Sequence, residues 1–322
     1  MIDKRLYADF VHFSQRQYDS LDYDPFHPML IELQKGMDPE EALWHSTLYM
    51  AYYNVGSFQV AFEEAPPVGR PFPEWLARLP VGVQRRNLRG GKVLDHLDSY
   101  VRLADEHGSQ WAYLTAGFTG DPKADWPKLQ ENVGKSWGNG RWSIFTTSEL
   151  YQKVNKIPVF PCNLMNEGSS GPRAGLKILF GPESTTTVGE LDRLTDLLFD
   201  DVRKKLTTKI PYLPYNHYDY AMLESQLCDF QSMYKGRYYV GRDIDRDQER
   251  LRGTAATLKR MGRRTDYLDR VWEARSAVFD HRYLGEHNNW RGREDYALTH
   301  YRRYGEVADH KTILETKGCV LY

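Results

Sequence analysis

The chain has 322 residues and a formal net charge of -1 at pH 7. Apolar residues make up 41% and charged residues 27%, so the chain can bury a full core, which excludes disorder as the default state. The three cysteines, Cys162, Cys228 and Cys319, have no paired spacing, which argues against a disulfide framework and a Cys-based zinc site. No apolar run approaches the roughly 20 residues that cross a bilayer, and the first ten residues lack a signal-peptide core. We therefore expect a cytoplasmic protein with no membrane partner.

The charge is unevenly distributed along the chain. Residues 1–65 carry 4 basic and 11 acidic side chains, whereas residues 231–311 carry 18 basic and 13 acidic ones. This asymmetry indicates either a polyanionic partner on the C-terminal side or helix faces that are simply solvated. The sequence does not decide between the two.

The clearest predicted helix begins after Asp38. Asp is a favoured N-cap, Pro39 suits the first turn, and Glu40 and Glu41 complement the positive end of the helix dipole. Apolar residues then recur at spacings of three and four, which predicts one core helix through Trp44, Leu48, Ala51, Val55, Phe58 and Phe62. Aromatic neighbours on this helix favour packing over stacking on a base: Tyr49, Tyr52 and Tyr53.

Further amphipathic stretches follow along the chain. A capping-box pattern at Thr187 to Glu190 predicts a helix start, and Thr265 is a candidate N-cap. The other predicted helices span residues 92–106, 220–234, 244–261 and 266–280. Proline and glycine concentrate at 65–82, 158–189 and 211–214, which predicts loops or lobe junctions there. Strand-like fragments are limited to 177–180 and 237–240. The sequence predicts a mainly α fold.

Residues 126–154 have the layout of a helix-hairpin-helix, with Gly138 and Gly140 between two helical segments. Glycines allow a sharp turn and a close approach of backbone amides to a phosphate. The start of the second helix, with Lys135 and Arg141 beside it and Trp142 following, would complete an anion site. We interpret the segment as a DNA-phosphate contact; the alternative is an ordinary turn between helices.

A second phosphate-binding candidate lies in residues 169–173, which read Ser-Ser-Gly-Pro-Arg, with Lys177 four positions later. Hydroxyl groups, a glycine that permits adjacent free amides, and a guanidinium group together suit a phosphate leaving group. A surface loop rich in turn-forming residues explains the same sequence equally well.

Four stretches together resemble the phage amino acid:DNA transferases: LYMAYYNVGSFQVAF at 48–62, GNGRWSIFTTSELYQKV at 138–154, SSGPR at 169–173 and GRYYVGRDIDRDQE at 236–249. The resemblance implies a helical DNA-glycosylase-like fold with a helix-hairpin-helix element, and an enzyme of thymidine hypermodification in the host cytoplasm. Such an enzyme replaces the phosphate or pyrophosphate of an activated 5-hydroxymethyluracil in double-stranded DNA with the amine of a free amino acid such as glycine. We expect residues 1–322 to form one helical catalytic domain. The domain either is undivided or consists of two lobes, about 1–125 and 126–322, with the active cleft between them.

The expected chemistry assigns roles to residues of the quoted motifs. The enzyme must hold an extrahelical base, stabilise departing phosphate and keep the attacking amine deprotonated. We expect Tyr238 and Tyr239 to face the uracil; for Asp243 and Asp245 the alternative role is to complement a helix dipole. We expect no cofactor and no required metal. The candidate residues are, for catalysis, Ser170, Arg173, Asp243 and Asp245; for substrate binding, Ser169, Lys177, Asn166 and Tyr239; and for DNA binding, Lys135, Gly138, Gly140, Arg141 and Trp142.

Two other readings stay open from the sequence. Cys162 would add to C6 of the ring in thymidylate-type chemistry, although a lone cysteine is more often buried packing. His217 and Asp219 form only a weak constellation for metal binding or proton transfer.

The competing functions are a helix-hairpin-helix DNA glycosylase and a non-catalytic DNA-binding protein. Many glycosylases of that kind have a catalytic Asp shortly after the second helix of the hairpin, whereas residues 161–166 contain no Asp. The expected mechanism places Gly140 and Arg173 on one shared cleft.

Overall fold

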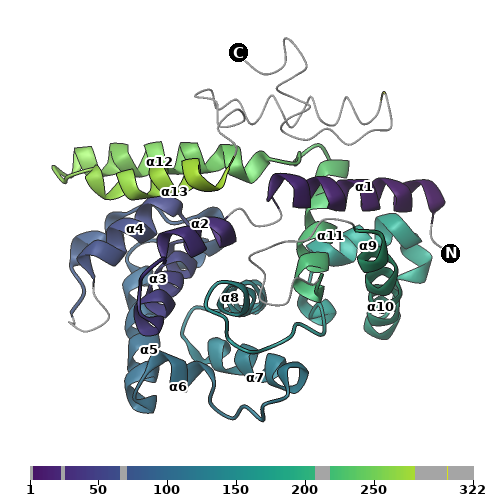
Figure 1. Cartoon of the computed structure of the whole chain (residues 1–322), viewed down its shortest axis with the longest axis horizontal. Helices are drawn as coiled ribbons and strands as arrows, with labels where there is room; N and C mark the ends of the chain where they lie inside the picture. Colours follow the sequence, from purple (N-terminus) through teal and green to yellow (C-terminus); the bar gives the residue numbers. More distant parts are fainter. Residues whose placement is uncertain (1–2, 23–25, 66–70, 207–217, 280–302, 304–322) are drawn as a thin grey trace. The chain divides into compact units, whose positions relative to one another are not determined.

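The structure is a computed structural model that describes residues 3–22, 26–65, 71–206, 218–279 and 303 (Figure 1). Helices form nearly all of its regular structure, and within the described ranges the only extended element is a single bridge residue, Val240. The prediction of a mainly α fold is confirmed. No described helix is both long enough and apolar enough to span a bilayer.

Contacts divide the chain into two units. The first unit comprises residues 1–25, 161–246 and 279–322, and the second comprises residues 26–160 and 247–278. Helix α12 (Arg242–Arg260) begins in the first unit and continues in the second. The expected single catalytic domain, with lobes meeting near residue 125, stays a prediction.

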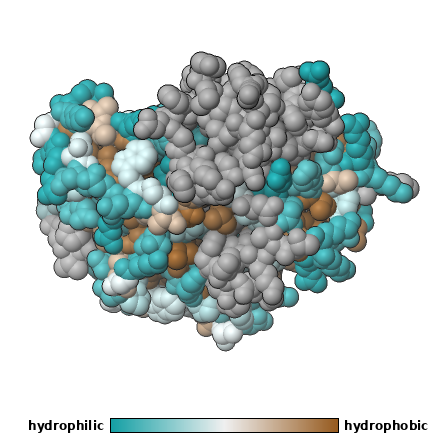
Figure 2. Space-filling view, turned by 45° about the horizontal axis from the view of Figure 1, so that its top comes forward, coloured by the Kyte–Doolittle hydropathy of each residue, from teal (hydrophilic) through white to brown (hydrophobic). Residues whose placement is uncertain are grey.

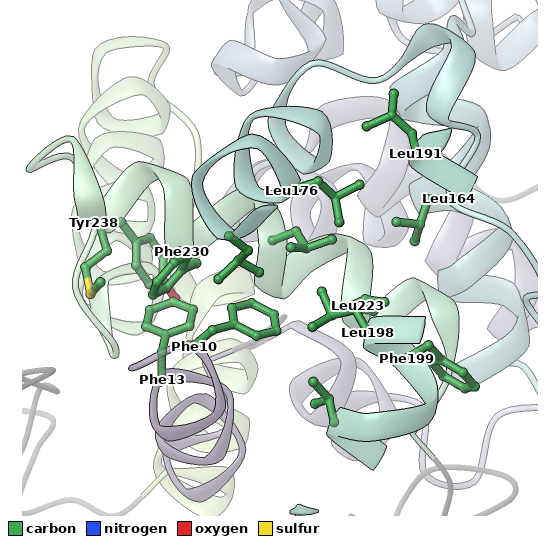
Figure 3. Packing of buried hydrophobic residues seen from close by; sticks show 14 of the residues in the cluster. Phe10, Phe13, Leu164, Leu176, Leu191, Leu198, Phe199, Leu223, Phe230 and Tyr238 are labelled. Carbon is green, nitrogen blue, oxygen red and sulfur yellow. The ribbon is translucent and has the colours of Figure 1, made fainter. Parts of the chain in front are cut away.

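The first unit is built around α11 (Tyr220–Tyr234), against which α1 (Lys4–Ser20) and α9 (Gly171–Phe180) pack. Phe10 and Phe13 of α1 meet Phe230 of α11 edge to face, with ring centroids 5.3 and 5.6 Å apart (Figure 3). Leucines from the neighbouring helices complete this buried cluster. The other helices of the unit are η3 (Asn166–Gly168), η4 (Pro182–Ser184) and α10 (Val188–Lys205).

Two glycines explain how closely α9 approaches α11. A Cβ added at Gly171 would lie 2.5 Å from the sulfur of Cys228, and one added at Gly175 would lie 2.5 Å from the carbonyl oxygen of Leu227. Because the two glycines are one helical turn apart, both face α11. This packing corrects the strand-like reading of residues 177–180, which form the end of α9. The stretch 158–189, predicted as a loop or a lobe junction, therefore contains a helix.

The second unit contains two packed helix pairs. In the first pair α3 (Pro39–Tyr52) packs against α4 (Val55–Glu64), and in the second α7 (Pro122–Lys135) packs against α8 (Arg141–Lys153). The unit's other helices are α2 (Phe26–Leu33), η1 (Glu74–Arg78), η2 (Val83–Leu88), α5 (Lys92–His107), α6 (Gln110–Leu114), η5 (Asp266–Leu268) and α13 (Asp269–Val278). Figure 2 shows one face of the molecule, on which hydrophilic side chains cover much of the described surface and brown hydrophobic areas are small.

The predicted start of α3 is confirmed, whereas its predicted length is wrong. The carboxylate of Asp38 accepts hydrogen bonds from the amides of Glu40 and Glu41 at 2.9 and 3.1 Å. The helix ends at Tyr52, and the following residue, Tyr53, adopts a left-handed conformation with φ of 45°. Asn54 then caps a new helix by accepting from the amides two and three residues later. The single helix expected through Phe62 is therefore two helices.

The remaining helix predictions have mixed outcomes. The capping box at Thr187 is present, because its hydroxyl accepts from the amide of Glu190 while the Glu190 side chain accepts from the amide of Thr187. The helices expected near residues 92–106, 220–234 and 244–261 are α5, α11 and α12. Thr265 makes no capping hydrogen bond, and the segment after it starts as the 3-10 turn η5. Residue 280, the last of that predicted helix, lies outside the described residues.

Candidate active site

The N-terminus of α9 brings together the residues predicted to hold phosphate. Ser170 is the N-cap, is exposed, and makes no capping hydrogen bond with its hydroxyl. Gly171 and Pro172 form the first turn, and Arg173 and Lys177 lie one turn apart on a face that is partly or fully exposed. Amides in the first turn of a helix have no partner within the helix, and the dipole there favours anions. This end of α9 therefore offers hydroxyl, amide and guanidinium donors to an anion.

Buried hydrogen bonds hold the start of α9 in place. The side-chain amide of Asn166 donates hydrogen bonds to Asp192 at 2.8 Å and to Thr195 at 3.3 Å, both on α10. The backbone carbonyl oxygen of Asn166 accepts hydrogen bonds from the backbone amide and the hydroxyl of Ser169 at 3.2 and 3.4 Å. Both Asn166 and Ser169 are buried. Their contacts position Ser170, and their predicted role in binding substrate stays a prediction.

A cluster of carboxyl groups surrounds the start of α12, and its central member, Asp22, belongs to none of the sequence motifs. The buried carboxyl of Asp22 accepts hydrogen bonds from the amides of Gly241 and Asp243 at 2.7 and 3.2 Å. The hydroxyl of Tyr238 also donates to it. Asp22 thus caps α12 from a position more than 200 residues earlier in the chain. Nothing in the local sequence around residue 22 marks this role.

Two carboxyl groups of this cluster have perturbed acidity. Burial raises the pKa of Asp22 well above its usual value, and the neighbouring charge of Asp243 adds to the shift, while hydrogen bonds from Tyr238 and backbone amides oppose it. Burial, followed by the charges of Asp243 and Asp22, likewise raises the pKa of Asp229. Gln17 donates to Asp229 at 2.9 Å and to Tyr238 at 3.1 Å, which links the two carboxyl groups. Groups with raised pKa values are suited to proton transfer near neutral pH.

The two acidic residues predicted for catalysis occupy different environments. Asp243 retains 30% side-chain exposure and forms ion pairs of 3.5 Å with Arg242 and Arg246. Asp245 is buried and accepts a hydrogen bond of 2.5 Å from the hydroxyl of Tyr239. Tyr238 and Tyr239 are themselves buried. Of the predicted pair, Asp243 is the carboxylate that solvent reaches.

Helix α11 connects the phosphate end of α9 with the acidic cluster. Cys228 lies directly against Gly171, and the next residue, Asp229, interacts electrostatically with Asp22 and Asp243. All of these residues belong to the first unit. The structure therefore brings the helix end that is predicted to hold phosphate and a set of carboxyl groups to the same level of one helix.

The predicted DNA-binding segment is a pair of helices, α7 and α8, joined by a short turn. Gly138 adopts φ of 85°, a conformation that favours glycine, and its added Cβ would lie 2.8 Å from a methyl group of Leu88. Gly140 has an extended backbone with φ of -112°, and nothing lies within 4 Å of its added Cβ. The expectation that both glycines are needed for backbone angles is thus wrong for Gly140. The space beside Gly140 is open, as a close approach of phosphate requires.

The side chains around this turn are placed as follows. Lys135 is exposed and donates to Asn132 at 2.8 Å. Arg141 lies over the ring of Phe145, 5.2 Å from its centroid. Trp142 packs edge to face against Tyr53 at 5.0 Å. The structure shows two helices joined by a short turn here, whereas a helix-hairpin-helix element and DNA binding by it stay predictions.

Gly140 belongs to the second unit and Arg173 to the first. The shared cleft expected for them stays a prediction. Asp219 caps α11 by accepting from the amide of Met222 at 2.9 Å, whereas His217 lies outside the described residues. The thiol of Cys162 is partly buried. The described part of the chain contains no group of three His, Cys, Asp or Glu side chains arranged to hold a metal ion.

Comparison with known proteins adds one finding. A family model with the description "Amino acid:DNA transferase" matches residues 19–239, about two thirds of the chain. The match begins just before Asp22 and includes α7, α8, α9 and α11. A comparison with curated proteins gives no match.

Proposed function

Because the chain belongs to the amino acid:DNA transferase family, we propose that it replaces the phosphate or pyrophosphate of a phosphorylated 5-hydroxymethyluracil in double-stranded DNA with the amine of an amino acid such as glycine. The family description supplies the donor and the acceptor, an amino acid and DNA. The modified base, the leaving group and the choice of glycine are our proposal.

One observation carries the proposal. The exposed N-terminus of α9, with Ser170 and Arg173, packs through Gly171 on Cys228, and the adjacent Asp229 belongs to the carboxyl cluster. Transfer of an amine to a phosphorylated methylene requires an anion site for the leaving group and a carboxylate for the ammonium group. The anion site lies on α9, which packs on α11, and Asp229 of the carboxyl cluster lies on α11 itself.

The chemistry follows from the two sites. The bond between the C5 methylene carbon and the phosphate oxygen breaks, and its electron pair leaves with the phosphate. Ser170, Arg173 and Lys177 stabilise that charge through hydrogen bonds that strengthen as it develops. The amine nitrogen forms the new bond to the methylene carbon and loses one proton. We assign the ammonium contact to Asp243, since Asp245 is buried against Tyr239.

Amino acids are mostly protonated at neutral pH, so a transferase must remove a proton from the ammonium group before it attacks. A carboxyl whose pKa is raised toward neutrality is a better proton acceptor than an ordinary carboxylate. Asp229, which is partly buried and has a raised pKa, provides such a group beside Asp243. We propose that the proton passes into this cluster.

DNA binding is assigned to the turn between α7 and α8. The open space beside Gly140 admits a phosphate to the N-terminus of α8, and Lys135 and Arg141 add positive charge. This contact would hold the DNA backbone while the modified base is extruded from the duplex, because enzymes that act on a base must reach it outside the base stack.

The test is a product analysis. The purified chain is incubated with duplex DNA containing phosphorylated 5-hydroxymethyluracil and a mixture of amino acids, and the DNA is digested to nucleosides for mass measurement. The proposal predicts an intact DNA backbone and a new nucleoside that is heavier than the nucleoside of 5-hydroxymethyluracil by the mass of one amino acid residue. A DNA glycosylase on the same scaffold would instead leave abasic sites, which alkali converts to strand breaks. Absence of a new nucleoside would reject the proposed transfer.

A further inference from the structure

A second basic segment adjoins the turn between α7 and α8. Residues 75–94 contain five basic side chains and no acidic one: Arg78, Arg85, Arg86, Arg89 and Lys92. Within this stretch residues 83–92 comprise η2 and the approach to α5, and we call them the η2 arm. Arg86, Arg89 and Lys92 of the arm are exposed.

Direct hydrogen bonds attach the η2 arm to the turn. The side chain of Asn87 donates to the carbonyl oxygen of Gly138 at 2.8 Å, and Arg85 donates to the same oxygen at 3.4 Å. Leu88 packs under Gly138, where it leaves no space for a Cβ. The arm and the turn therefore form one continuous surface within the second unit.

Two side chains of helix α5 bond to the backbone of the same turn. The buried ring of His96 bonds to the carbonyl oxygen of Trp137 at 2.5 Å, and the hydroxyl of Ser99 accepts from the amide of Trp137 at 2.9 Å. Burial, with the nearby charge of Arg85, lowers the pKa of His96 to about 3, so the ring is neutral at neutral pH. A neutral ring donates from Nδ1 and accepts from Arg85 at Nε2, which matches the 3.3 Å contact between them.

The exposed groups on this surface match the chemistry of nucleic acid. The arm contributes Arg86, Arg89 and Lys92, the last residue of α7 contributes Lys135, and neither the arm nor residues 135–140 contain a carboxylate. Each segment also exposes one large apolar side chain, Val83 at 54% and Trp137 at 47%. Cations that contact phosphates, with apolar groups between them that contact sugars or bases, are typical of DNA-binding surfaces.

We propose that the η2 arm binds the DNA backbone beside the turn between α7 and α8, so that two adjoining segments contact successive phosphates. The inference deepens the proposed function, since it rests on DNA as the partner of the turn. It assigns binding to residues 83–92, which neither the glycine motif nor the basic C-terminal third of the sequence indicates.

The experiment measures binding of the full chain to an unmodified 20-base-pair duplex by fluorescence anisotropy over a range of salt concentrations. The double variant Arg86→Glu/Arg89→Glu should bind at least about tenfold more weakly at 0.1 M salt, and its slope of log K against log salt should be shallower by about two. The control is Arg102→Glu, on α5 ten residues beyond Lys92 and so about 15 Å along the helix axis; its side chain is 68% exposed. The control should change affinity less than twofold.

Retained charge separates a lost contact from a damaged fold. The variant Arg86→Lys/Arg89→Lys should bind within about threefold of the unaltered chain, because lysine also pairs with phosphate. Equal binding by the glutamate double variant and by Arg102→Glu would overturn the inference. Because the duplex is unmodified and no turnover is measured, failure of amine transfer would not affect this result.

Discussion

The carboxyl group of Asp22 accepts a hydrogen bond of 2.7 Å from the amide of Gly241, 219 residues later in the chain. Together with its bond from the amide of Asp243, this contact caps the start of α12 with a side chain from the segment after α1. Asp22 is buried and lies near Asp229 and Asp243. The same carboxyl group therefore caps a helix of the first unit and belongs to the carboxyl cluster with raised pKa values in the candidate site.

The raised pKa of Asp22 predicts a specific pH dependence of stability. Between about pH 3.9, where an unfolded Asp titrates, and the higher native pKa, the folded chain binds more protons than the unfolded chain. Its free energy of unfolding should therefore fall as pH rises through this window. Asp22→Asn should show a flatter decline, measured by chemical unfolding between pH 4 and 8. An unchanged slope in this variant would show that Asp22 is ionised throughout.

Gly175 tests the packing of α9 on α11. Gly175→Ala places a methyl group 2.5 Å from the carbonyl oxygen of Leu227, a backbone atom that cannot rotate away. We expect the free energy of unfolding to fall by about 1–3 kcal/mol, as for other overpacked sites. Gly189→Ala in α10 is the matched control, since nothing lies within 4 Å of its added Cβ. The control should be neutral or slightly stabilising, and equal loss in both variants would contradict the packing argument.

The two glycines of the α7–α8 turn should respond differently to substitution. Gly138→Ala forces a left-handed conformation on alanine and a contact with Leu88, so we expect a loss of about 1–2 kcal/mol in stability. Gly140→Val should leave helicity and thermal stability nearly unchanged, because its backbone is extended and its surroundings are open. It should nevertheless weaken DNA binding by filling the space beside α8. Unaltered affinity for DNA in a folded Gly140→Val variant would place the DNA contact elsewhere.

Arg173 tests the anion site of α9. Arg173→Ala should reduce kcat for amine transfer by about 100-fold, as loss of a donor to developing negative charge does in other enzymes. The fold should be retained because the side chain is partly exposed. Arg193→Ala, an exposed arginine on α10 in the same unit, is the control and should keep kcat within twofold. Comparable kcat values for the two variants would remove Arg173 from the mechanism.

The sequence predicted helix starts well, because capping chemistry is local. Asp38 and Thr187 act on amides within three residues, so their patterns suffice to place α3 and α10. The end of α3 was missed because the apolar spacing of three and four continues across the break at Tyr53. The capping role of Asn54 was the available indication of a second helix, and periodicity alone concealed it.

Other features depend on contacts between distant segments, which local patterns do not encode. Residues 177–180 resemble a strand in composition, yet they are helical because Gly171 and Gly175 fit α9 against α11. Asp22 gains its role from backbone amides near residue 241. Ser170 and Arg173, which we propose to bind phosphate, could be selected from the sequence because one short motif contains them both.

The most direct measurement of the central claim follows labelled glycine and released phosphate in one reaction. The chain is mixed with duplex DNA that contains phosphorylated 5-hydroxymethyluracil and ¹⁵N-glycine, and both products are quantified. Our account predicts one labelled nucleoside for each phosphate or pyrophosphate released, with no abasic sites. Phosphate release without label in the DNA, or label-free DNA with abasic sites, would contradict it.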